Sequence, residues 1–217
     1  MAAVSETIVR EYFELHGFLL RQYRKHVAPA GREDDEIDFL AVNPHLQGPT
    51  ADLPFVLSSA DLAFVERALI VIKAWHTDVF SPVLLTNAPK LFRFLEKKAF
   101  QKTVREFGKE GVLLKILVVP ALPHDAEARD RSIAILRSKG IDAVLSFRTM
   151  LAELVSQVQP NRNYQKSDLL QLIRILKNYD FFRGPQLELF KTKQKRARKR
   201  APGRQVEGDP GQEPGHD

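Results

Sequence analysis

The chain has no cysteine in its 217 residues, which excludes disulfide bonds, thiolate metal sites and cysteine nucleophiles together. No apolar run approaches the roughly 20 residues that span a bilayer. The first residues, MAAVSETIVREYF, lack a basic segment followed by an apolar stretch, so they do not predict a secretory signal. With 44% apolar and 28% charged residues, these absences favour a globular cytoplasmic protein that has no membrane partner.

Several catalytic motifs are also missing. There is no Gly-rich phosphate loop of the P-loop or Rossmann type, and no G-x-S-x-G turn around a nucleophilic serine. The six histidines lack the i, i+4 spacing of a metal-binding helix. The sequence therefore gives no support to nucleotide-dependent, serine-hydrolase or histidine-ligated zinc chemistry.

The net charge of +6 comes mostly from the end of the chain. Residues 191–217 carry eight basic and four acidic side chains, so they contribute +4 of that total. From residue 184 onward the chain is too polar to offset the entropy of ordering, so we expect a domain over 1–183 and a disordered tail over 184–217. The tail is expected to bind phosphate backbones or, equally well, only to aid solubility. Its candidate nucleic-acid-binding residues are Lys195, Arg196, Arg198, Lys199 and Arg200.

Helical and strand patterns alternate along the first domain. We predict helices that start at a Ser5 cap and stop at Gly17, that start at a Thr86 or Asn87 cap and run over 89–107, and that cover 125–138, 146–158 and 168–178, the last capped by Ser167. We predict strands over 18–27, 36–42, 67–75, 112–119 and 141–145, and a loop over 44–65 with a short helix near 59–66. The strand–helix–strand run near the end implies parallel pairing. The predicted fold class is α/β, a mixed central β-sheet flanked by helices.

Two of these strands carry a charge among apolar residues: Asp38 in EIDFLAV (36–42) and Lys73 in LIVIKAW (69–75). Burying an ionisable group costs free energy unless the group is paired, hydrogen-bonded or bound to metal. Residues two apart in a strand share a face, so Asp38 lies with Glu36 and Leu40. If the two strands pair, Asp38 and Lys73 can lie on one face, within reach of a common metal ion and phosphate.

This pattern resembles the restriction-endonuclease-like nucleases of the PD-(D/E)XK superfamily. The resemblance covers about residues 5–120, in the order helix, strand, strand with acid, strand with lysine, helix and strand. It implies an αβββαβ core, here with extra C-terminal helices, and a Mg²⁺-dependent endonuclease that acts on DNA, often as a homodimer. It also implies that Asp38 and the backbone carbonyl of Ile72 hold Mg²⁺, and that Lys73 orients or activates the attacking water.

The chain departs from the family at Val71, where the family's Glu, Asp or Gln is expected as the second metal ligand. An aliphatic side chain cannot coordinate a hard cation. Three interpretations stay open. The second acid has moved to Glu36 or Glu96, or the domain is a degenerate nuclease that keeps the fold and binds nucleic acid, or the match is accidental. The predicted function is a nuclease-like nucleic-acid-binding or processing protein, and the alternative is a non-catalytic interaction protein.

Both charged strand residues also have a purely structural interpretation. Asp38 could pair with a basic neighbour, Arg21 or Arg24. Lys73 could bury its aliphatic stem against Trp75 while its ammonium reaches solvent. These interpretations predict strand residues that stabilise the fold and contact no ligand.

Overall fold

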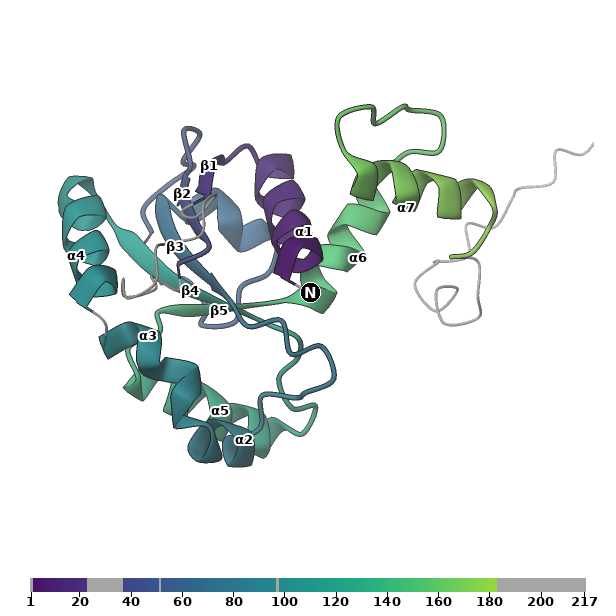
Figure 1. The fold of residues 1–217 in the computed structure, drawn as a ribbon. Helices are drawn as coiled ribbons and strands as arrows, with labels where there is room; N and C mark the ends of the chain where they lie inside the picture. Colours follow the sequence, from purple (N-terminus) through teal and green to yellow (C-terminus); the bar gives the residue numbers. More distant parts are fainter. Residues whose placement is uncertain (1, 23–36, 51, 97, 183–217) are drawn as a thin grey trace, which may run out of the picture. The chain divides into compact units, whose positions relative to one another are not determined.

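A computed structural model of the chain describes residues 2–22, 37–50, 52–96 and 98–182, which form an α/β fold around a five-stranded mixed sheet (Figure 1). The residues up to Asp180 belong to one compact unit, and Phe181 and Phe182 are the described part of a second. The predicted disordered tail and the candidate ligand Glu36 lie outside the described residues. Within the described ranges, no helix is both long enough and apolar enough to cross a membrane.

The five strands follow one another in the sheet in chain order, and they are β1 (Leu19–Gln22), β2 (Phe39–Val42), β3 (Arg67–Ile72), β4 (Leu113–Val119) and β5 (Ala143–Ser146). The pairs β1–β2 and β2–β3 are antiparallel, whereas β3–β4 and β4–β5 are parallel. The predicted mixed sheet and the parallel pairing of its last two strands are therefore confirmed.

The described helices are α1 (Ala2–Leu15), α2 (Pro82–Asn87), α3 (Arg93–Glu96), α4 (Lys98–Phe107), α5 (Ala126–Ser138), α6 (Phe147–Gln157) and α7 (Asp168–Asn178). Short 3₁₀ segments are η1 (Ala60–Phe64), η2 (Pro89–Phe92) and η3 (Gly108–Glu110). The predicted last three helices and the short helix in the loop are confirmed. Ser167 caps α7 as expected, because its side chain accepts a hydrogen bond from the Leu170 N–H.

The predicted cap at Thr86 or Asn87 is wrong, whereas residues 89–107 are helical where the structure describes them, as η2, α3 and α4. A separate helix, α2, begins earlier, where Ser81 accepts a hydrogen bond from the Leu84 N–H and Pro82 occupies the first turn. Thr86 and Asn87 therefore lie in the last turn of α2 and cap nothing. Because Pro89 lacks an N–H and disfavours helical geometry at the residue before it, α2 ends there and a 3₁₀ segment follows.

The predicted N-cap at Ser5 is also wrong. The helix α1 begins at Ala2, and Ser5 lies inside it at 1% exposure, with its Oγ 2.9 Å from Nε2 of His76. A serine near a helix start has the same sequence pattern whether it caps the helix or bonds a distant residue. The predicted stop is confirmed: Gly17 has φ +80, which a glycine adopts at no steric cost.

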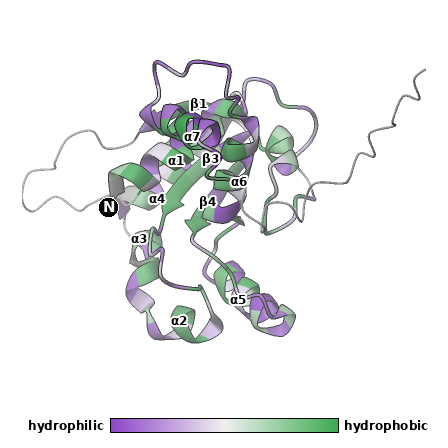
Figure 2. Ribbon diagram, turned by 90° about the vertical axis from the view of Figure 1, so that its right-hand side faces the viewer, coloured by the Kyte–Doolittle hydropathy of each residue, from purple (hydrophilic) through white to green (hydrophobic). Residues whose placement is uncertain are grey.

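Helices cover both faces of the sheet. Figure 1 shows α1 and α6 on one side and α2, α3 and α5 on the other. On the second side the strand residues Leu69, Val71 and Leu117 belong to one apolar core with Leu85 of α2 and Leu136 of α5. Figure 2 shows the hydrophobic strands β3 and β4 among these helices. Asp38 and Lys73, which flank β2 and β3, are half-buried beside this apolar core.

The end of α1 carries a small polar cluster. The Tyr12 hydroxyl lies 2.9 Å from Oγ of Ser59, and burial raises the pKa of Tyr12 to about 12. His16 packs its ring 4.8 Å from the ring of Tyr12, and its buried Nε2 has no hydrogen-bond partner among the described residues. Burial lowers the pKa of His16, and the nearby Glu153 carboxylate opposes this only in part.

We expect His16 to make the protein less stable in mild acid. In the folded state His16 resists protonation, whereas the unfolded chain takes up a proton near the ordinary pKa of about 6.5. The contribution is present above that pKa, and it is lost as the pH falls through it toward the lower folded value. Denaturant unfolding at several pH values should show a flatter profile for H16Q over this window. Parallel profiles for H16Q and wild type would contradict the assignment.

Candidate functional site

The two predicted charged residues flank paired strands, Asp38 immediately before β2 and Lys73 immediately after β3. Phe39 pairs with Ile70, and the Asp38 N–H also donates to the Ile70 carbonyl at 3.0 Å, one residue out of the ladder register, as at a β-bulge. Ile37 belongs to the same apolar core as Leu40 and Val71, so the strand does not alternate regularly through Asp38. The two strands pair, as the predicted site requires, but the expected shared face of Asp38 and Leu40 is wrong.

The Asp38 carboxylate holds the end of β3. Its Oδ2 accepts a hydrogen bond from the Ile72 N–H at 2.6 Å, and the side chain is half-buried. Hydrogen bonds to an ionised carboxylate are short and stronger than neutral ones. Asp38 thus fixes the backbone immediately before Lys73, a contact that the sequence did not predict.

Lys73 lies between β4 and α3. Its backbone N–H donates to the Val118 carbonyl at 2.9 Å, and its ammonium lies 5.0 Å from the ring centroid of Phe94. Phe94, which is 1% exposed, therefore presents a ring face to a half-buried cation, an attractive arrangement. Trp75 packs its ring against Phe80 at 6.1 Å and is 40% exposed at the end of the same segment.

Val71 occupies the position of the missing acid and belongs to the apolar core at 3% exposure. Glu96, one of the two candidate replacements, is exposed at the end of α3. It lines a hollow with residues of α2 and α5, among them Leu85 and Ile135, and neither charged strand residue lines that hollow. The structure therefore places the Asp38 carboxylate beside the residue before Lys73, and it places Glu96 in different surroundings.

The described part of the site offers few metal ligands. Across residues 2–22, 37–50, 52–96 and 98–182, no three His, Asp or Glu side chains come together as a ligand group. What remains is one carboxylate, that of Asp38, and the backbone carbonyl of Ile72. Mg²⁺ is usually held by one or two carboxylates plus water and phosphate oxygens. The described residues are thus one carboxylate short of the expected pair.

The loop after β3 contacts α1 and α6, the two helices on the other side of the sheet from α2, α3 and α5. His76 lies 2.9 Å from the Ser5 hydroxyl of α1, and its ring lies 4.6 Å from the ring of Phe147 at the start of α6. Ligands of α/β proteins commonly bind outside the carboxyl ends of parallel strands, and this loop leaves the carboxyl end of β3. The Ser5–His76 contact could not be predicted from local sequence patterns, because 71 residues separate the partners.

Comparison of the chain with protein-family models, with curated proteins and with solved structures gives no match. The functional inference therefore rests on the geometry at the ends of β2 and β3 and on the charge distribution around it.

Proposed function

We propose that this protein binds nucleic acid through a restriction-endonuclease-like domain of the PD-(D/E)XK type. The observation that carries the proposal is the hydrogen bond from the Ile72 N–H to the Asp38 carboxylate, which brings that acid to the residue before Lys73, at the ends of two paired strands. The element order supports it as well, because α1, β1, β2, β3, the helices α2 to α4, and β4 follow the αβββαβ order. In this proposal the Lys73 ammonium supplies a positive charge to a backbone phosphate.

Binding, and not hydrolysis, is the function that the described residues favour. The described site has a valine where a second carboxylate is expected, and Glu36, the remaining candidate, lies outside the described residues. If Mg²⁺ binds, Asp38 and the Ile72 carbonyl would hold it, and the ion would polarise the phosphate and lower the pKa of bound water. Hydrolysis is thus conditional on an acid such as Glu36.

One observation favours the alternative, a non-catalytic binding or interaction protein on a degenerate nuclease fold. The hydrogen bond from the Ile72 N–H gives Asp38 a structural task without any ligand. Asp38→Asn keeps an oxygen acceptor for this N–H and removes the charge, whereas Asp38→Ala removes both. Comparing the two variants separates the structural task from a role in binding.

We expect K73A to weaken binding of duplex DNA roughly tenfold at about 0.1 M salt, because the variant loses one phosphate contact. K73R should retain most of the affinity, because it keeps that contact. Gel-shift assays measure both affinities. Unchanged duplex affinity in K73A would rule out this site as an interface.

We expect D38A to lose about 1–3 kcal/mol of stability, because the half-buried Ile72 N–H is left without its acceptor, and D38N to stay near wild type. Denaturant unfolding measures both free energies.

A cleavage assay on supercoiled and linear DNA in Mg²⁺ or Mn²⁺ separates the remaining interpretations. No cleavage by the wild type supports the binding function. Cleavage that D38N abolishes would establish hydrolysis and a second acid elsewhere. Cleavage that persists in both D38N and K73A would show that the chemistry lies outside this site. Tail binding, a homodimer and a cytoplasmic location remain predictions of the sequence.

A further inference from the structure

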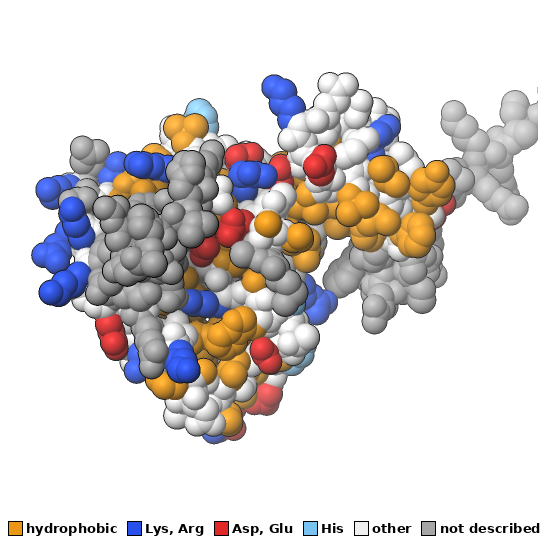
Figure 3. Space-filling view, in the orientation of Figure 1, with side chains coloured by type: hydrophobic (Ala, Val, Ile, Leu, Met, Phe, Trp, Pro, Cys, Tyr) orange, Lys and Arg blue, Asp and Glu red, His pale blue; other side chains and the backbone are white. Residues whose placement is uncertain are grey.

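The outer side of α4 carries four cations, Lys98, Lys102, Arg105 and Lys109, which we call the α4 cationic stripe. They are spaced four, three and four residues apart, so they follow one side of α4 into the adjoining η3. All four side chains are exposed. Figure 3 shows Lys and Arg side chains gathered at the edge of the molecule that α4 forms in Figure 1.

The opposite side of α4 is anchored, which keeps the stripe facing outward. Phe100 and Thr103 are buried, and Phe100 packs edge-on against Phe94 with the ring centroids 5.2 Å apart. At the end of α4, the Arg67 guanidinium donates a hydrogen bond to the Phe107 carbonyl at 2.6 Å and lies over the Phe107 ring. The helix cannot turn its cations inward without breaking these contacts.

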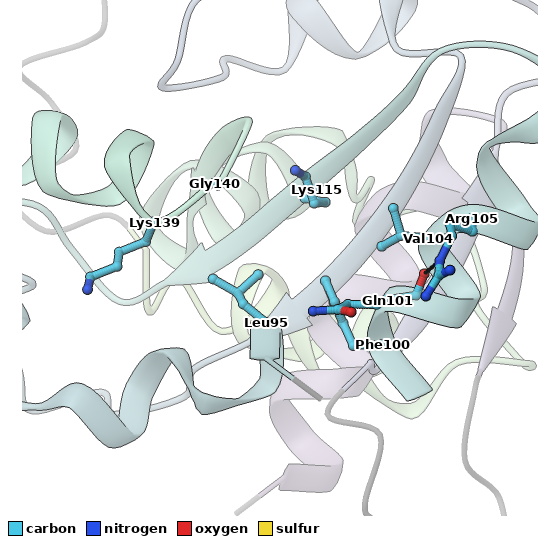
Figure 4. A pocket seen from close by; sticks show the side chains of 8 residues that line it. All are labelled: Leu95, Phe100, Gln101, Val104, Arg105, Lys115, Lys139 and Gly140. Atoms are coloured by element: carbon cyan, nitrogen blue, oxygen red, sulfur yellow. Dashed lines mark hydrogen bonds between the residues drawn. The ribbon is translucent and has the colours of Figure 1, made fainter. Parts of the chain in front are cut away.

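A hollow of about 380 Å³ lies beside the stripe (Figure 4). Its rim carries Arg105, Lys115 and Lys139, and apolar side chains of α3 and α4 line part of it. Lys115 pairs with Asp142 at 3.4 Å, and the three charged ends point in different directions in Figure 4. A site for one compact anion needs convergent donors, so this spread of positive charge suits an extended polyanion better.

We infer that the α4 cationic stripe binds the phosphate backbone of duplex nucleic acid, an inference that rests on the proposed function and names its interface. The stripe from Lys98 to Lys109 is about 16 Å long at the helical rise of 1.5 Å per residue. A duplex presents one negative charge per about 1.7 Å of its axis, so it offers several phosphates over that length.

The surface chemistry of α4 argues against other polyanionic partners. Its described residues include no exposed large hydrophobic side chain. Single-stranded nucleic acids are typically bound by aromatic side chains on which the bases stack. Membrane-surface helices pair a basic face with an apolar face that enters the lipid, whereas the apolar side of α4 is packed on the protein core. The described exposed charges of α4 are those of Lys and Arg, which favour the backbone of a duplex.

The stripe is physically connected to the strand site. The Phe94 ring that lies under the Lys73 ammonium also packs against Phe100 of α4. One aromatic pair therefore supports both Lys73 and the helix that carries the stripe. A duplex held along α4 would be bound next to the element that orients Lys73.

The test measures how the affinity of the full chain for a short DNA duplex depends on salt concentration. Each phosphate contact contributes about 0.9 to the slope of log K against log salt. The variant K98Q/K102Q/R105Q/K109Q should therefore lose up to about 3.6 of slope and roughly two to three orders of magnitude in affinity at about 0.1 M salt. The control R10Q/R129Q/R162Q/K166Q removes the same charge from exposed positions outside α4, and it should keep the wild-type slope.

Two further variants protect the test against misfolding. R105Q alone should lower the slope by about 0.9, and K98R/K102R/K109R should preserve it because the charges are kept. A wild-type slope in the fourfold stripe variant, or an equal loss in the control, would overturn the inference and leave the proposed function standing. A single strand bound more tightly than the duplex would also overturn it. If the wild type binds no nucleic acid, the proposed function fails as well.

Discussion

The V71E variant is expected to be less stable than the wild type without divalent metal, and to regain stability when Mg²⁺ or Mn²⁺ is added. Val71 is 3% exposed, and the Asp38 carboxylate accepts a hydrogen bond from the N–H of the next residue, Ile72. A carboxylate buried at position 71 is desolvated and lies near a second carboxylate, and both effects disfavour its charged form. A divalent cation between the two acids would remove that penalty.

The size of the recovery can be estimated by mass action. A metal that binds only the folded state adds about 2.7 kcal/mol when its concentration is 100 times its dissociation constant. The melting temperature of V71E should thus rise with metal concentration, while that of the wild type stays nearly constant. V71Q introduces a side chain of similar size without the charge, so it should show little rise.

The double variant D38N/V71E provides the sharpest control. It should lose the metal-dependent rise, because only one carboxylate remains between β2 and β3. Equal metal-dependent rises in the melting temperatures of V71E and D38N/V71E would mean that the metal binds elsewhere and that Asp38 is not a metal ligand. Cleavage of duplex DNA gained by V71E alone would show that a single missing acid distinguishes this site from an active one.

F94A is expected to lose about 3–5 kcal/mol of stability. Phe94 is almost fully buried, and removing a buried phenylalanine ring forfeits its transfer free energy and leaves a cavity. The same change removes the ring under the Lys73 ammonium and the partner of Phe100. F94A should therefore also weaken duplex binding, because Lys73 and α4 lose their common support.

A matched control exists on the other face of the sheet. Phe13 of α1 is fully buried and packs edge-on against Phe18 with the ring centroids 5.2 Å apart, as Phe94 does against Phe100. F13A should lose similar stability in denaturant unfolding without a specific loss of duplex affinity when both variants are folded. Equal affinities of F94A and F13A would mean that Phe94 has only a packing role.

Periodicity and turn residues predicted the features of the fold that depend on local sequence. The strand β4 is an apolar run bounded by turns, and the later helices α5 to α7 have clear caps, so both fall where expected, whereas β3 ends at Ile72, before the predicted end at residue 75. The pairing of β2 with β3 was a condition of the predicted site, and the structure meets it. These signals depend on neighbours in the chain, which a sequence displays directly.

The features that the sequence did not predict depend on distant partners. The hydrogen bond from the Ile72 N–H to Asp38 requires the register of two strands, and the Ser5–His76 contact requires the packing of α1 beside the loop after β3. The α4 cationic stripe is different, because its spacing is visible in the sequence. The helix prediction used the apolar side of α4 and did not include the cations on the opposite side.

The central claim is that nucleic acid binds at the end of β3. NMR spectra of ¹⁵N-labelled full-length protein, titrated with a short DNA duplex, test it most directly. We expect the largest shifts at the backbone amides of Ile72 and Lys73, at the indole of Trp75, which is the single tryptophan of the chain, and along the α4 cationic stripe. A titration that saturates while these resonances stay unchanged would contradict the account.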